Sequence, residues 1–92
     1  MKNTIKTNLF FKVIDDKDKQ LHSTWHVTAF VRDEANHNDV GAAKMEVAGF
    51  LTQDANDHLD NVAIQEDLEE NGYTVAHVNE IPQGAEVIEV HY

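Results

Sequence analysis

The feature that most constrains this chain is a pair of long stretches in which apolar and polar residues alternate. A repeat of two residues is the period of a half-buried β-strand. In the first stretch, 5–14, the apolar face consists of Ile5, Leu9, Phe11 and Val13. In the second, 21–32, it consists of Leu21, Trp25, Val27, Ala29 and Val31. The charged segment 15–19 between them predicts a turn, so we expect two antiparallel strands with one apolar face to be covered.

Three further segments have β-strand character. Segment 41–52 alternates, with Ala43, Met45, Val47 and Leu51 on one side, and follows the polar segment 33–39. It predicts the third strand of an antiparallel meander. Segments 73–81 and 85–92 are rich in β-formers, and residues 81–84 between them contain Pro82 and Gly84, which suit a type I turn. We therefore expect a C-terminal hairpin.

One segment, 57–71, has the ends of a helix that covers the sheet. Asp57 suits the N-cap, and Gly72 is placed as the glycine that follows a helix. An alternative interpretation makes 59–64 a strand and only 65–71 helical. The predicted fold is a single α+β domain over 1–92, with an antiparallel sheet in the order β-β-β-α-β-β covered by one helix.

The charge of the chain is strongly asymmetric. The net charge is −10 over 92 residues, but residues 1–32 carry six Lys and Arg against three Asp, a net charge of +3. The remaining residues carry only Lys44 against fourteen acids, a net charge of −13. Such a surface repels nucleic acid and anionic lipid and favours a basic protein surface as partner. We expect no direct binding to nucleic acid or to a membrane.

Little in the sequence points to catalysis. The absence of cysteine excludes disulfides, thiolate metal sites and cysteine nucleophiles. Ser23, the only serine, lies within a predicted strand, and His22 and His26 on one strand lie about 13 Å apart, too far to share a metal. We therefore expect a protein that is not an enzyme, with no catalytic, cofactor-binding or metal-binding residue. The longest early apolar run, 9–11, is too short for a signal peptide, and we expect a cytoplasmic protein.

The acids between residues 54 and 70 are the candidate partner-binding residues. They are Asp54, Asp57, Asp60, Glu66, Asp67, Glu69 and Glu70. The leading hypothesis is a small acidic inhibitor or adaptor that docks this face on a basic partner surface. In one version the carboxylates mimic nucleic acid phosphates, as in small acidic inhibitors of the phage type.

Two alternatives use other segments. Residues 54–60 carry carboxylate and amide oxygens at alternating positions, which suits a hard cation or a small ligand, although Leu59 and Gln65 stand where a calcium loop needs Gly and Glu. The last segment, 85–92, is a candidate edge strand for a homodimer.

A third alternative comes from a resemblance. Residues 62–64, followed by 69–74, resemble in layout the β4 strand and acetyl-CoA pyrophosphate loop of GNAT-type N-acetyltransferases. Gly72 matches the loop glycine, while Glu69 and Thr74 replace the basic or amide residue and the second small residue. The resemblance implies a reduced acyl-CoA-binding protein.

Overall fold

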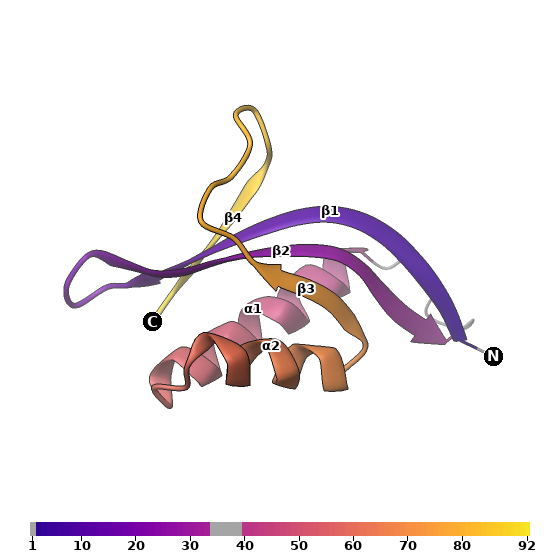
Figure 1. Cartoon of the computed structure of the whole chain (residues 1–92), viewed down its shortest axis with the longest axis horizontal. Coiled ribbons are helices and arrows are strands. Elements are labelled where there is room, and N and C mark those ends of the chain that lie inside the picture. The colour runs from indigo at the N-terminus through magenta and orange to yellow at the C-terminus, as the bar shows by residue number, and fades with distance from the viewer. Residues whose placement is uncertain (1, 34–39) are drawn as a thin grey trace.

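The computed structural model describes residues 2–33 and 40–92 as a four-stranded sheet with two helices on one face (Figure 1). The elements in chain order are β1 (Lys2–Asp15), β2 (Gln20–Asp33), α1 (Val40–Asn56), α2 (Asn61–Glu70), β3 (Tyr73–His77) and β4 (Val87–His91). The sheet order is β3-β2-β1-β4, with β1 parallel to β4 and the other pairs antiparallel. The α+β class is confirmed, but the predicted wholly antiparallel sheet and single covering helix are wrong. Residues 34–39 of the predicted loop lie outside the described residues.

The predicted hairpin of β1 and β2 forms, and a bulge changes which residues of β2 face the helices. The register of β2 shifts against both neighbouring strands at Thr28. Val27 and Phe30, three residues apart, therefore both join the core, whereas strict alternation had placed Ala29 and Val31 there. A bulge bends its strand and increases the local twist. The long hairpin curves over the helices in Figure 1.

The predicted third strand is instead the longer helix, α1. Its core residues Ala43, Val47, Leu51 and Ala55 recur every four residues and are at most 1% exposed. This spacing fits one face of a helix as well as one face of a strand. Met45 separates the two interpretations, because a strand would bury it and the structure leaves it 79% exposed.

The connection between the helices explains why Asp57 is not an N-cap. The amide of Leu59 donates to the carbonyl of Asp54, and the amide of His58 donates to the carbonyl of Ala55. With His58 at φ 60°, this is the Schellman ending of α1, and Asp57 belongs to that ending.

Helix α2 then begins three residues later than predicted. The Asp60 carboxylate accepts a hydrogen bond from the amide of Ala63 at 2.8 Å and is the actual N-cap. Residues 61–64 are helical, so the strand interpretation of 59–64 is wrong. The glycine that ends the helix is confirmed, since Gly72 has φ +90° and donates its amide to Glu69.

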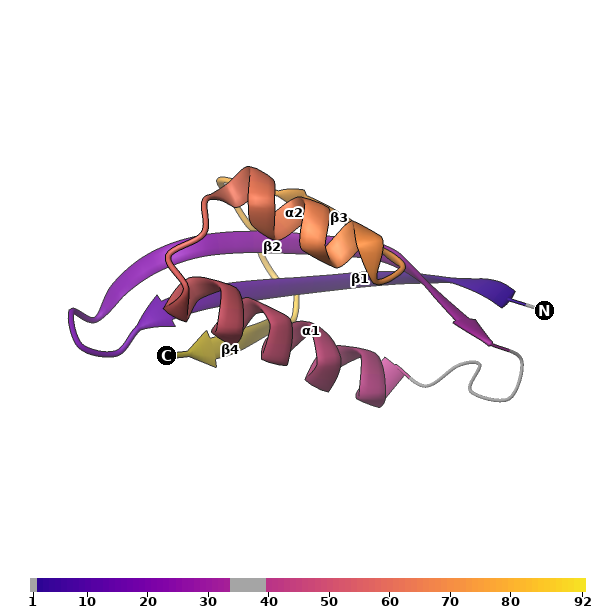
Figure 2. The same cartoon turned by 90° about the horizontal axis from the view of Figure 1, so that it is seen from below.

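The predicted C-terminal hairpin is wrong, because β3 and β4 lie at opposite edges of the sheet and run in the same direction. Their connection, 78–86, crosses the face of the sheet opposite the helices (Figures 1 and 2). Its turn places Pro82 first and Gly84 third, with φ +86° at the glycine, as a type II turn requires and a type I turn does not. β4 pairs with β1, the edge of the hairpin that β3 leaves open.

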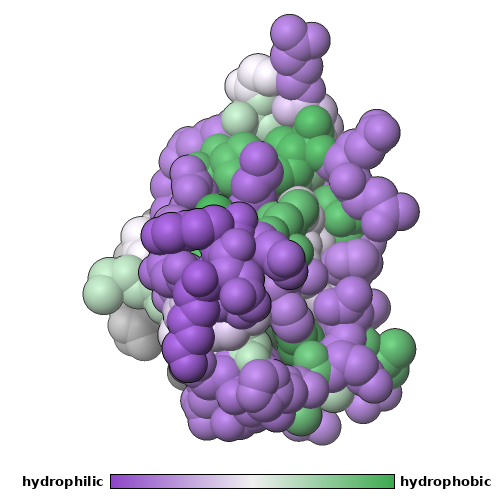
Figure 3. All heavy atoms as spheres, turned by 90° about the vertical axis from the view of Figure 1, so that its left-hand side faces the viewer, coloured by the Kyte–Doolittle hydropathy of each residue, from purple (hydrophilic) through white to green (hydrophobic). Residues whose placement is uncertain are grey.

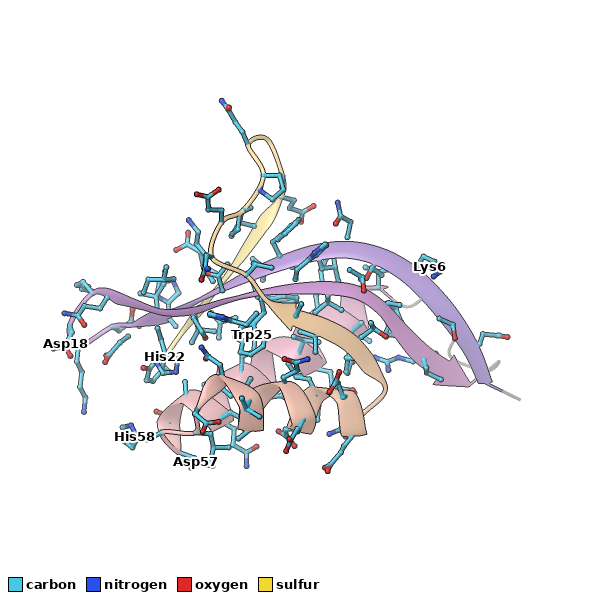
Figure 4. All side chains as sticks on the ribbon, viewed as in Figure 1. Lys6, Asp18, His22, Trp25, Asp57 and His58 are labelled. Atoms are coloured by element: carbon cyan, nitrogen blue, oxygen red, sulfur yellow. The ribbon has the colours of Figure 1, made fainter. Side chains whose placement is uncertain are left out.

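The core lies between the sheet and the two helices. Trp25 is fully buried there, between β2 and the helices (Figure 4), and its indole N–H donates to Ser23 Oγ at 2.8 Å. Ile64 and Leu68 of α2 are also buried. Each helix thus packs on the sheet through its own apolar face, and this packing fixes the position of one helix relative to the other.

Candidate functional site

An acidic groove lies between α1 and α2. It has a volume of about 420 Å³ and is lined by Phe50, Gln53, Asp54, Leu59, Ala63, Glu66, Asp67 and Glu70. We call it the interhelical groove. None of these lining residues is Lys or Arg, so within the part of the chain that the structure describes the groove has carboxylates without a cation among them.

Asp54 is the most unusual residue of the groove. It belongs to the last turns of α1, packed beside Leu51 and Ala55, and is only 5% exposed. Its Oδ2 atom has no hydrogen-bond partner among the described residues. A buried carboxylate without a donor carries a desolvation cost that a surface carboxylate does not.

The surroundings of Asp54 favour its protonated form. The pKa of Asp54 is raised to about 6, first by burial and then by a carboxyl–carboxyl hydrogen bond to Asp67 and by the negative charges of Asp67 and Asp57. Two carboxylates can form that hydrogen bond only when one of them carries a proton. Near neutral pH the proton shared by Asp54 and Asp67 is therefore lost, and a cation is needed in its place to balance the two carboxylates.

The structure brings four of the seven predicted partner-binding residues to this groove. They are Asp54, Glu66, Asp67 and Glu70. The other three lie outside its lining. Asp57 is exposed at the end of α1, where it projects beside His58 (Figure 4), and Asp60 is the N-cap of α2. Glu69 is exposed and accepts a hydrogen bond from Gln65 at 3.5 Å.

Sequence reasoning missed the uncharged part of the groove. Phe50 and Gln53 come from α1, and Leu59 and Ala63 come from the connection and the start of α2. On a helix, residues three and four apart share a face, so 50, 53 and 54 form one wall and 63, 66, 67 and 70 form the other. This spacing is visible in the sequence, but it indicates a groove wall only if 40–56 is known to be a helix.

The serine and the two histidines that the sequence analysis set aside have structural contacts. Ser23 is buried and accepts the hydrogen bond of the Trp25 indole. The His26 ring stacks on Phe10 at 4.1 Å between centroids, on the face opposite the helices, and the His22 ring meets Tyr92 edge-on at 5.7 Å.

The alternatives based on 54–60 and on 62–64 gain no geometric support. Residues 54–60 form the end of α1 and the cap of α2, and the described residues include no group of three or more His, Asp and Glu placed to hold a metal ion. Residues 62–64 lie in α2, so the strand that the GNAT resemblance implies there is wrong.

A second polar cluster ties the sheet to α1. The Tyr73 hydroxyl donates to Glu46 Oε1 at 2.7 Å and accepts from Arg32 Nη2 at 2.8 Å. Burial raises the pKa of Tyr73 to about 12. Arg32 also lies over the Phe30 ring, 4.9 Å from its centroid. Because these groups are paired with one another, we interpret the cluster as a structural contact between the sheet and α1.

One end of the molecule has a predominantly polar surface. Figure 3 views the end of the molecule that carries the β1–β2 turn and the C-terminus, and hydrophilic atoms cover most of it, with smaller hydrophobic areas between them. Among the described helices, none has the length and apolar character needed to cross a membrane.

No protein-family model matches the sequence, and the comparisons with curated proteins and with solved structures give no match either.

Proposed function

We propose that this protein is a non-catalytic interaction module that docks on a basic surface of another protein. The docking surface consists of the interhelical groove and its acidic rim, namely Asp54, Asp57, Asp60, Glu66, Asp67, Glu69 and Glu70. The single observation that carries the proposal is the convergence of four carboxylates on one groove, where Asp54 is buried and its Oδ2 atom has no hydrogen-bond partner among the described residues.

This arrangement of acids favours the complex with a basic partner over the free protein. A buried carboxylate next to a second carboxylate destabilises the free fold at neutral pH. Titratable groups held at such a cost are concentrated at functional sites, where a ligand provides the missing partner. A cationic partner surface supplies that missing charge, and the exposed acids of the rim attract it from a distance.

The test is capture of a partner from a lysate of the source cells on the immobilised protein, at low salt and at several hundred millimolar salt. We expect a protein partner with a basic surface that is retained at low salt and released at high salt, because the contacts of the rim are screened. Retention that does not depend on salt would contradict electrostatic docking.

A charge-matched pair of variants locates the surface. The double substitution Glu66→Gln and Glu70→Gln removes two charges from the groove, and Asp18→Asn with Glu80→Gln removes two exposed charges elsewhere. We expect only the first pair to weaken capture. Equal loss with both pairs would mean that net charge alone governs binding, and the groove would lose its assigned role.

A further inference from the structure

We propose that the interhelical groove receives an arginine side chain of the partner, whose guanidinium lies between the carboxylates of Asp54 and Asp67. This inference rests on the proposed function and names the group that the docking surface recognises. The observation behind it is that Asp54 lines the groove of about 420 Å³ while its buried Oδ2 atom has no hydrogen-bond partner among the described residues.

The shape and chemistry of the groove suit a guanidinium. The two central carboxylates come from different helices and both line the groove, and Asp67 raises the pKa of Asp54 through a hydrogen bond and through its charge. A planar guanidinium has five N–H donors in a fixed fork and bridges two carboxylates, whereas an ammonium is a compact and strongly hydrated charge. The guanidinium takes the place of the proton and provides donors to both acids.

The uncharged lining suits the rest of the arginine side chain. Phe50, Leu59 and Ala63 give the groove an apolar portion beside its acids. The methylene stem of arginine packs along apolar surface while its charged end is held by carboxylates. A bare divalent cation would make no use of this portion, and the described residues offer no cluster of ligands for one.

Among the described residues, every titratable group that lines the groove with Asp54 is an acid, and these are Glu66, Asp67 and Glu70 of α2. Outside the lining, the negative charge of Asp57 at the end of α1 also acts on Asp54. Protonation of the Asp54–Asp67 pair removes one of the two charges that hold the guanidinium. Binding of arginine is therefore expected to release a proton near pH 6 and to weaken as the pH falls.

The test is a titration of the ¹⁵N-labelled protein with Nα-acetyl-arginine N-methylamide, followed by amide chemical shifts at neutral pH and low salt. The neutral isostere, Nα-acetyl-citrulline N-methylamide, and the corresponding lysine compound are the matched probes. We expect saturable shifts at Gln53, Asp54, Ala63 and Asp67 with arginine, about tenfold weaker binding of lysine, and no shifts with citrulline.

Two variants show whether Asp54 is the acceptor. Asp54→Asn keeps the size of the side chain and is expected to weaken binding of the arginine probe about tenfold or more, while Glu80→Gln, an exposed acid in 78–86, leaves binding unchanged. Equal binding by wild type and Asp54→Asn would overturn the proposal. Equal shifts with lysine, or larger shifts with calcium chloride, would overturn the arginine assignment.

Failure of this inference is distinguishable from failure of the proposed function. If lysate capture is salt-sensitive and depends on Glu66 and Glu70 but the arginine probe gives no shifts, the docking surface holds and the arginine pocket is wrong. If the probe binds the groove but no partner is captured, the pocket holds and docking on a basic protein is wrong.

Discussion

Replacing Asp54 by asparagine is expected to stabilise the protein at neutral pH, although it alters a buried residue. The asparagine amide reproduces the shape of a protonated carboxyl and donates a hydrogen bond to Asp67 without adding a negative charge. Because the pKa of Asp54 is raised in the fold, the folded state holds this proton more tightly than the unfolded chain does. In the wild-type protein, the stability lost by ionising Asp54 is therefore zero below the pKa of this residue in the unfolded chain. The loss grows as the pH rises toward its pKa in the folded state.

The size of this effect follows from the two pKa values. The pKa of Asp54 rises from 3.8 to about 6, and one pKa unit corresponds to about 1.36 kcal/mol, so the penalty at pH 7 is at most about 3 kcal/mol. Water in the open groove screens part of it, and we expect a gain of about 1–2 kcal/mol for the variant. In a domain of this size each kcal/mol moves the Tm by about 4–8 °C.

The assay is urea unfolding of wild type, Asp54→Asn and the surface control Glu80→Gln, at pH 7 and again below pH 4. Comparing the variant with wild type at each pH removes the contribution of the other acids, which titrate in both proteins. We expect the stability difference to be present at pH 7 and nearly lost below pH 4. A variant less stable than wild type at pH 7, or an equal difference at both pH values, would contradict a raised pKa of Asp54 in the fold.

Three further predictions follow from other parts of the fold. Gly72→Ala is expected to destabilise the protein by about 1 kcal/mol or more in thermal unfolding, because φ +90° strains any side chain, and an unchanged Tm would contradict this. Tyr73→Phe removes the donor to Glu46 and is expected to cost about 1–2 kcal/mol in urea unfolding, a loss that would be missing if the hydroxyl were water-exposed. The hydrogen bond to Asp16 raises the pKa of His91, so this pair stabilises the fold below the unfolded pKa of the histidine and loses its effect as the pH rises through the folded value. Asp16→Asn should lower the pKa of His91 in an NMR titration, and an unchanged value would remove the pair from the account.

Local patterns in the sequence predict the parts of the fold that depend on local chemistry. The β1–β2 hairpin follows from alternation around a charged turn, and the end of α2 follows from Gly72. The interpretation of 41–52 as a strand failed because core residues four apart satisfy both a strand and a helix. Only the exposure of Met45, a tertiary property, separates them.

The pairing of β4 with β1 depends on long-range contacts. A turn around Pro82 and Gly84 predicts a reversal of the chain, but not which strand the next segment joins. Ile88 and Val90 pair with Phe11 and Val13 and complete the core beside α1. The alternation of one segment contains no information about that partner.

The acids of the candidate site were predicted from charge density, and four of the seven lie at one groove. Their convergence was not predictable, because it requires two helices whose facing sides meet, and one of those helices had been interpreted as a strand. The burial of Asp54 was also not predictable, because the packing of Leu51 and Ala55 beside it decides which of the seven acids is buried.

Chemical-shift mapping of the labelled protein in complex with its captured partner shows whether the interhelical groove is the docking surface. We expect the largest amide shifts at 50–54 and 63–70, the two walls of the interhelical groove, and a reduced response in Asp54→Asn. Largest shifts along β4, with the groove unaffected, would contradict it.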